Sequence, residues 1–140
     1  MAHLRFFFFV VVALVLPGLA VATGFGGDSP PSRIPIPAHD FSATVEDHGG
    51  VVVEVDRVSY NGEVFLYGTL GAAQLTIPFD KLTMIEFKAS PKDDKRQAVA
   101  TTKDGQEITL LVDDDTLCYG RTKVGNYSIE VEDLRRIRFK

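Results

Sequence analysis

The sequence contains one cysteine and three histidines, and these scarcities exclude several classes of small protein. A disulfide needs two thiols, so Cys118 alone excludes a disulfide-stapled scaffold, and packing must stabilise the fold. His39 and His48 lack the spacing of a zinc site. The G-x-S-x-G motif of serine hydrolases and the spacing of an EF-hand are also absent. We therefore predict a protein that is not an enzyme and that has no cofactor.

Basic residues are also in short supply. The sequence has 15 Lys and Arg against 19 Asp and Glu, and without Arg5, which falls in the segment described next, the net charge is −5 (14 − 19). Binding to nucleic acid needs a clustered positive surface that can neutralise phosphates. The composition therefore argues against nucleic acid as the main partner.

The longest apolar run lies near the N-terminus. Arg5 precedes an unbroken apolar stretch over residues 6–16, and Ala20-Val21-Ala22 places small residues where a signal peptidase cleaves. This pattern predicts a secretory signal peptide over residues 1–22, and no cysteine follows it that could carry a lipid. The run is shorter than the ~20 residues of a spanning helix, which disfavours the alternative of an uncleaved anchor. We expect an exported bacterial protein, periplasmic or extracellular, with no stable membrane span after cleavage.

Residues 23–40 are rich in glycine and proline, a composition typical of an extended tether. The alternative is a docking peptide for a groove that recognises proline. The domain itself is expected to span residues 41–140.

This domain contains an internal repeat. Residues 66–88 match residues 118–140 without a gap at a shift of 52 (118 − 66), which indicates a tandem duplication. We place the first repeat at about 41–88, a polar connector at 89–96 and the second repeat at about 97–140. In this alignment Cys118 replaces Leu66, so we predict a small buried hydrophobic residue, with a reactive free thiol as the alternative. The identical pairs are Tyr67/Tyr119, Gly68/Gly120, Ile77/Ile129, Leu82/Leu134, Ile85/Ile137, Phe87/Phe139 and Lys88/Lys140.

Short β-branched and aromatic runs separated by turn residues make up both repeats, and no window keeps a helical spacing. Asn61-Gly62 is the strongest hairpin signal, because this pair favours a type I′ turn. We predict an all-β fold of about ten short antiparallel strands in two sets of five, forming a small barrel or sandwich. Its two halves either share one core or pack face to face. The expected strands are 41–46, 51–58, 64–70, 74–79, 84–88, 98–102, 107–112, 117–122, 126–131 and 135–139.

One local feature resembles a known fold. Residues 80–83 form a tetrad that predicts a single 3₁₀-like turn, with Leu82 plugging the core, before a final strand. Pro78 cannot donate to a ladder, so its strand is expected at an edge, or to be near its end there. The order of strand, tight turn and final strand is similar to the end of SH3-like barrels, the nearest analogue. The aromatic groove residues of such domains are not recognisable here, so no site follows from the resemblance.

The last expected strand carries a basic stripe. Arg136, Arg138 and Lys140 alternate along it and point outward, and Arg135 flanks them at the turn. We predict that these four residues contact an anionic protein or polymer of the cell envelope. The alternative is an edge strand that uses positive charge to prevent aggregation. An open edge there would also permit strand-to-strand dimers, so the oligomeric state stays undecided.

Acidic residues gather in turns. Asp113, Asp114 and Asp115 are consecutive, and such hard oxygen ligands suit Ca²⁺. We favour a solvated turn, because Asp is also a common turn former. A Ca²⁺-stabilised domain is one alternative. Another is a small hydrolase that uses these carboxylates, or Asp47 with His48.

Overall fold

The computed structural model describes residues 33–90 and 92–140. The expected signal peptide and most of the expected tether lie outside these residues. The predicted all-β fold is confirmed: ten antiparallel strands and two 3₁₀ turns account for the regular structure of the described ranges. The strands are β1 (Ala43–Asp47), β2 (Val52–Tyr60), β3 (Phe65–Leu70), β4 (Ala73–Pro78), β5 (Leu82–Ala89), β6 (Lys95–Thr102), β7 (Glu107–Asp113), β8 (Leu117–Arg121), β9 (Asn126–Glu130) and β10 (Leu134–Phe139).

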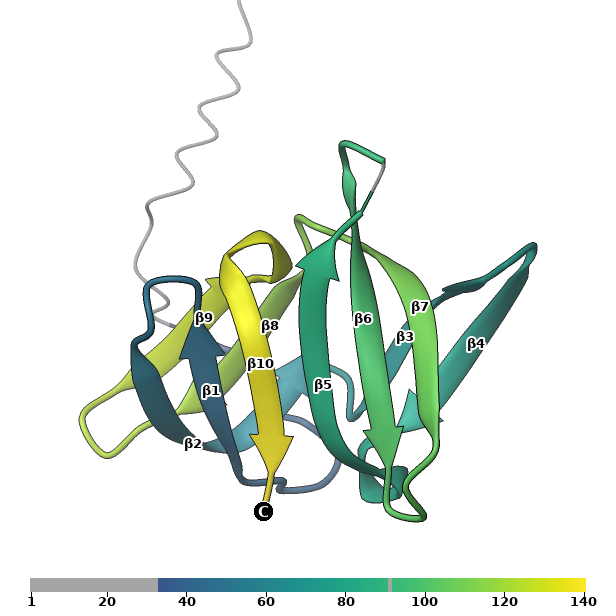
Figure 1. Cartoon of the computed structure of the whole chain (residues 1–140). Coiled ribbons are helices and arrows are strands. Elements are labelled where there is room, and N and C mark those ends of the chain that lie inside the picture. The colour runs from purple at the N-terminus through teal and green to yellow at the C-terminus, as the bar shows by residue number, and fades with distance from the viewer. Residues whose placement is uncertain (1–32, 91) are drawn as a thin grey trace, which may run out of the picture.

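All ten strands belong to one sheet, in the order β4-β3-β7-β6-β5-β10-β1-β2-β8-β9. The sheet is strongly curled, so that β1, β10, β5, β6 and β7 form one wall, and the outer strands of both ends fold behind it (Figure 1). The edges are β4 and β9. Pro78 ends β4, so the prediction that its strand lies at an edge is confirmed.

The sheet has a pseudo-two-fold symmetry that exchanges the two repeats. If each strand of the first repeat (β1–β5) exchanges its label with the equivalent strand of the second (β6–β10), the strand order is reversed. The repeats also exchange their first hairpins, so that each lies between strands of the other repeat. β1 and β2 lie between β10 and β8, and β6 and β7 lie between β5 and β3. Each half of the sheet therefore contains strands of both repeats.

The Asn61-Gly62 turn has the predicted backbone but does not make a hairpin. Both residues have positive φ, 52° and 83°, as a type I′ turn requires. The flanking strands β2 and β3 meet only in the isolated bridge between Tyr60 and Glu63. Beyond the turn β2 pairs with β8, and β3 pairs with β4 and β7. The turn reverses the chain, but β2 and β3 separate after it because each pairs with a strand of the other repeat.

The tight turn before the last strand is present in both repeats. The 3₁₀ turns η1 (Phe79–Lys81) and η2 (Val131–Asp133) precede β5 and β10. The residue that follows each turn, Leu82 or Leu134, is almost completely buried, as predicted for a core plug. Buried hydrophobic side chains from both repeats form one continuous cluster, which decides between the two expected arrangements in favour of a shared core.

The alternative that the last strand is an edge strand is wrong. β10 is not an edge strand, because it pairs with β5 on one side and β1 on the other. Protection of an open edge therefore cannot explain its basic residues, and β10 offers no free edge for dimerisation. The segment that links β5 to β6 lies within the expected connector 89–96, since β5 ends at Ala89 and β6 begins at Lys95.

Within the residues that the structure describes, we found no helix with the length and apolar character needed to cross a membrane.

Candidate functional site

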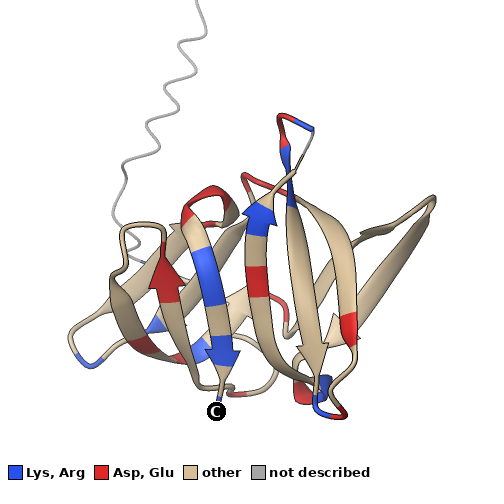
Figure 2. Ribbon diagram, in the orientation of Figure 1, with Lys and Arg blue, Asp and Glu red and all other residues tan. Residues whose placement is uncertain are grey.

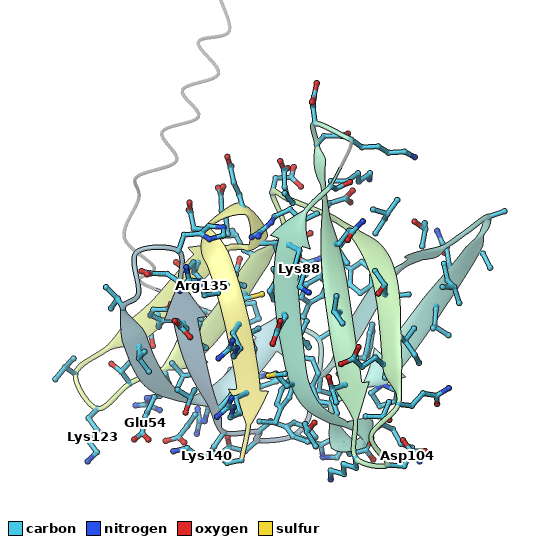
Figure 3. All side chains as sticks on the ribbon, in the orientation of Figure 1. Glu54, Lys88, Asp104, Lys123, Arg135 and Lys140 are labelled. Atoms are coloured by element: carbon cyan, nitrogen blue, oxygen red, sulfur yellow. The ribbon has the colours of Figure 1, made fainter. Side chains whose placement is uncertain are left out.

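Three of the four basic residues of the predicted stripe lie on β10, in the middle of the curled wall, and Lys140 directly follows this strand. Blue bands on β10 alternate with red bands on the adjoining strands β1 and β5 (Figure 2). Arg135 and Lys140 mark the two ends of this stripe (Figure 3). Carboxylates thus lie on both strands that adjoin β10, Glu46 on β1 and Glu86 on β5.

Three of the four basic residues have acidic partners. The Glu46 carboxylate on β1 forms ion pairs with the guanidinium groups of Arg135 and Arg136, at N–O distances of 3.3 Å and 3.8 Å. Arg136 also lies 3.6 Å from a carboxylate oxygen of Glu86, its cross-strand partner on β5. Lys140 lies 3.2 Å from Glu54. Cross-strand pairs of this kind add modestly to sheet stability, so these three residues have a structural use.

Arg138 differs from the other three. It is exposed, and no ion pair or side-chain hydrogen bond is found for it in ranges 33–90 and 92–140. Its neighbours across the ladders are Thr44 and Met84, which carry no charge. With Thr44, Glu46, Val52 and Arg136 it lines a hollow of about 250 Å³. Val52 adds an exposed apolar side chain, 58% accessible, to this hollow.

The acidic residues of 113–115 do not converge. Asp113 pairs with Lys95, while the backbone of Asp114 bonds to Asp94 and Glu132. Among the described residues, no group of three or more Asp, Glu, His or Cys side chains is arranged to hold a metal ion. The Ca²⁺ alternative stays a prediction from sequence.

Asp47 and His48 line an open hollow of about 620 Å³ near one end of the molecule, together with Ser128, Glu130 and Asp133. The Asp47 carboxylate accepts a hydrogen bond of 2.9 Å from the Val51 backbone N–H. This bond closes the β1–β2 turn. The symmetry-related hollow replaces His48 and Asp133 with Lys103 and Lys81. A hydrolytic role for Asp47 with His48 likewise stays a prediction.

A buried arginine was missed by the sequence reasoning, which placed Arg96 in the polar connector. Its side chain is almost inaccessible, with the residue 7% exposed. The guanidinium donates to the carbonyl oxygens of Val131 (2.6 Å), Phe87 (2.8 Å), Glu132 (3.1 Å) and Leu134. Burial lowers the pKa of Arg96, while the nearby charges of Asp133, Glu132 and Asp114 oppose that shift. Arg96 therefore ties β5 to the η2 turn.

The same position in the other half is aromatic. The first hairpins of the repeats align at a shift of 55, because Ala43 and Ala98 have equivalent ladder partners, so Arg96 corresponds to Phe41. The Phe41 ring packs on Phe79 at 5.7 Å, and Phe79 packs on Phe139 at 4.7 Å. Val131 replaces Phe79 in the second repeat, which leaves room for the guanidinium.

Cys118 is buried, as predicted for a residue in the place of Leu66. Burial raises the pKa of its thiol to about 12. Burial also raises the pKa of Tyr127 to about 12, with smaller contributions from the charges of Asp47 and Cys118. Since a thiol needs its ionised form to act as a nucleophile, Cys118 is unsuited to catalysis at neutral pH.

Comparisons with known proteins place the chain in a family without pointing to an activity. Neither the curated proteins nor the solved structures contain a match to this chain. A family model matches residues 37–140, which include every strand and both 3₁₀ turns. The chain therefore belongs to the family that this model defines, whose description reads "Uncharacterised protein".

Proposed function

We propose that this protein is a non-enzymatic binding module of the bacterial cell envelope, which holds an anionic protein or polymer on the sheet face around Arg138. The observation that carries the proposal is the charge of Arg138, which has no ion pair within the described part of the chain, beside three basic residues that are paired. A guanidinium without a partner keeps its donors available for a carboxylate or phosphate.

The surroundings of Arg138 favour an anionic partner in two ways. The Val52 side chain gives the partner an apolar contact next to the charge. Arg136 adds a second guanidinium in the same hollow, and it is only partly satisfied by Glu46 and Glu86, at 3.8 Å and 3.6 Å. The expected export to the envelope would bring this face to anionic proteins and polymers.

The test is a pull-down from envelope extract with the protein, its Arg138→Glu variant and a Lys123→Glu control. Lys123 lies at the tip of the β8–β9 hairpin, away from β10, so it matches the charge change at a distant exposed site (Figure 3). Arg136 is unsuitable for reversal, because a third carboxylate would then lie between Glu46 and Glu86.

We expect one retained partner with the wild type and the control, and its loss with Arg138→Glu. The interaction should also weaken as salt concentration rises, because exposed charges are screened. Equal retention by Arg138→Glu and wild type would remove this face from the proposal.

A further inference from the structure

The two halves of the sheet differ most where β3 meets β7. β8 pairs with β2 at three positions, Arg121↔Asp56, Tyr119↔Ser59 and Cys118↔Tyr60. The equivalent strand β3 pairs with β7 only at Thr69↔Leu111, which corresponds to the first of these. Tyr67 and Leu66, the counterparts of Tyr119 and Cys118, therefore have no ladder partner on this side among the described residues.

The sequence explains the difference. With the first hairpins aligned at a shift of 55, Val58-Ser59-Tyr60 of β2 corresponds to Asp113-Asp114-Asp115. Val58 to Tyr60 continue β2 along β8, with a bulge at Arg57, whose φ is 51°. Aspartate is depleted in strands and favoured in turns, so β7 stops at Asp113 and the chain turns away. The flank of β3 before Thr69 therefore has no paired strand beside it in the described ranges, and we call it the open flank of β3.

A groove of about 380 Å³ lies beside this flank, between β3 and β7. Its apolar surface comes from Phe65, Tyr67 and Leu111. The Tyr67 ring is fixed by an edge contact with Tyr60 at 5.0 Å and by a 3.0 Å hydrogen bond that its hydroxyl accepts from Asn61. The polar lining residues are Thr69, Gln74, Thr76, Lys95 and Asp113.

One end of the groove is acidic. Lys95 is bonded to Asp113, and the charges of Asp94 and Asp115 also raise the pKa of its ammonium group. At this end Asp113 lines the groove and neutralises Lys95, while Asp94 and Asp115 add negative charge nearby, which favours a basic group in whatever binds there.

We infer that this groove binds an extended peptide segment, which adds a short strand to the open flank of β3 in the place that β2 occupies beside β8. Main-chain hydrogen bonds to an unpaired strand supply affinity without a fixed sequence, and side chains that fit the lining supply selectivity. The chemistry predicts a segment without proline that places an apolar or aromatic side chain near Phe65 and Tyr67. It also predicts Lys or Arg at the end near Asp113 and Asp115.

This site is separate from the Arg138 face. Arg138 lies on β10 and pairs with β1 and β5, whereas β3 and β7 lie beyond β6 in the sheet. The two proposals can therefore fail independently.

The repeat supplies a matched pair of variants. Thr76 lines the groove from the edge strand β4, and Ser128 holds the equivalent place on β9 at a shift of 52. Thr76→Arg fills the groove with a long side chain and adds positive charge. Ser128→Arg makes the same change in the half where β2 already covers β8.

The experiment is selection of a displayed library of random octapeptides on the purified protein. The affinity of each enriched peptide is then measured for the wild type, Thr76→Arg and Ser128→Arg. We expect enriched sequences with a basic end and no central proline, at least tenfold weaker binding to Thr76→Arg and unchanged binding to Ser128→Arg. Amide chemical shifts should move at residues 65–69 and 111–113 on adding such a peptide.

Three results would overturn the inference. One is a library that yields no enriched sequence. Another is a set of peptides that bind Thr76→Arg as well as the wild type. The third is a chito-oligosaccharide, tested in parallel, that moves the same amides when no peptide does, since the groove would then bind a glycan.

Discussion

Ile85 and Ile137, the same position in the two repeats, face each other as ladder partners of β5 and β10. The pairs on either side, Met84↔Arg138 and Glu86↔Arg136, repeat with their roles exchanged. The pseudo-two-fold axis therefore passes through the contact between the two isoleucines. Both side chains are buried, at 0% and 1% exposure, so the symmetry centre is also part of the core.

This symmetry makes the repeats interdependent, and it predicts how a divided chain behaves. Residues 33–90 lack the β6–β7 hairpin that separates β5 from β3, and residues 92–140 lack the β1–β2 hairpin that separates β10 from β8. Each fragment alone exposes the apolar surface that the other covers. We expect neither fragment to fold as a monomer, and an equimolar mixture to recover the β-sheet circular dichroism of the whole chain. A fragment that unfolds cooperatively as a monomer would contradict the hairpin exchange.

The local pattern of the sequence predicted the strands well, because alternation and turn residues act over a few neighbours. All ten strands lie within a few residues of their expected ranges, and η1 overlaps the turn predicted at 80–83. Strand partners were predicted less well. The Asn61-Gly62 turn implied a β2–β3 hairpin, but a turn signal carries no information about partners from distant parts of the chain.

The candidate site was predicted only in part for the same reason. The outward direction of Arg136 and Arg138 follows from alternation, but the partners of Arg136, Glu46 and Glu86, lie on other strands. Burial of Arg96 depends on carbonyls of the η2 turn, 35 or more residues away in sequence. Its charged neighbours gave no sign of burial. The open flank of β3 appears only when the two halves are compared as ladders.

Gly120 is a position where the packing leaves no room for a side chain. A Cβ atom there would lie 2.7 Å from the Cβ of Val55 on the adjoining strand β2. Gly68, its counterpart, meets the Leu111 carbonyl oxygen in the same way at 2.5 Å. We expect Gly120→Ala to lower the free energy of unfolding by about 1–3 kcal/mol, measured by urea denaturation. Gly125→Ala is the control, because its Cβ would meet no atom within 4 Å, and an equal loss in both variants would contradict the close approach.

The carbonyls around Arg96 should lose their donor when the guanidinium is removed. Arg96→Ala leaves the oxygens of Val131, Leu134 and Phe87 without the bonds that they accept in a buried setting. We expect a loss of at least about 3 kcal/mol in unfolding free energy, since each unsatisfied buried group costs about 1–3 kcal/mol. Arg138→Ala, on an exposed arginine, should stay within about 0.5 kcal/mol of the wild type. Similar stability of both variants would show that the Arg96 bonds add little.

The buried Cys118 thiol makes stability depend on pH in the alkaline range. Its pKa is about 12 in the folded protein, against an ordinary value of 9.0 in the unfolded chain. Below pH 9 the thiol is neutral in both states and contributes no pH dependence. Between about pH 9 and 12 only the unfolded chain ionises, so the free energy of unfolding falls as pH rises, by up to ~1.4 kcal/mol per pH unit.

Urea denaturation at pH 8 and pH 10 measures this effect. The wild type should lose roughly 1 kcal/mol more than Cys118→Ala between the two pH values, whatever the variant's own stability. Tyr127, with its pKa raised from 10.0 to about 12, contributes to both proteins and cancels in the comparison. A thiol reagent at pH 8 should react with Cys118 only after urea is added. Rapid labelling of the folded protein, or equal pH dependence with and without the thiol, would contradict its burial.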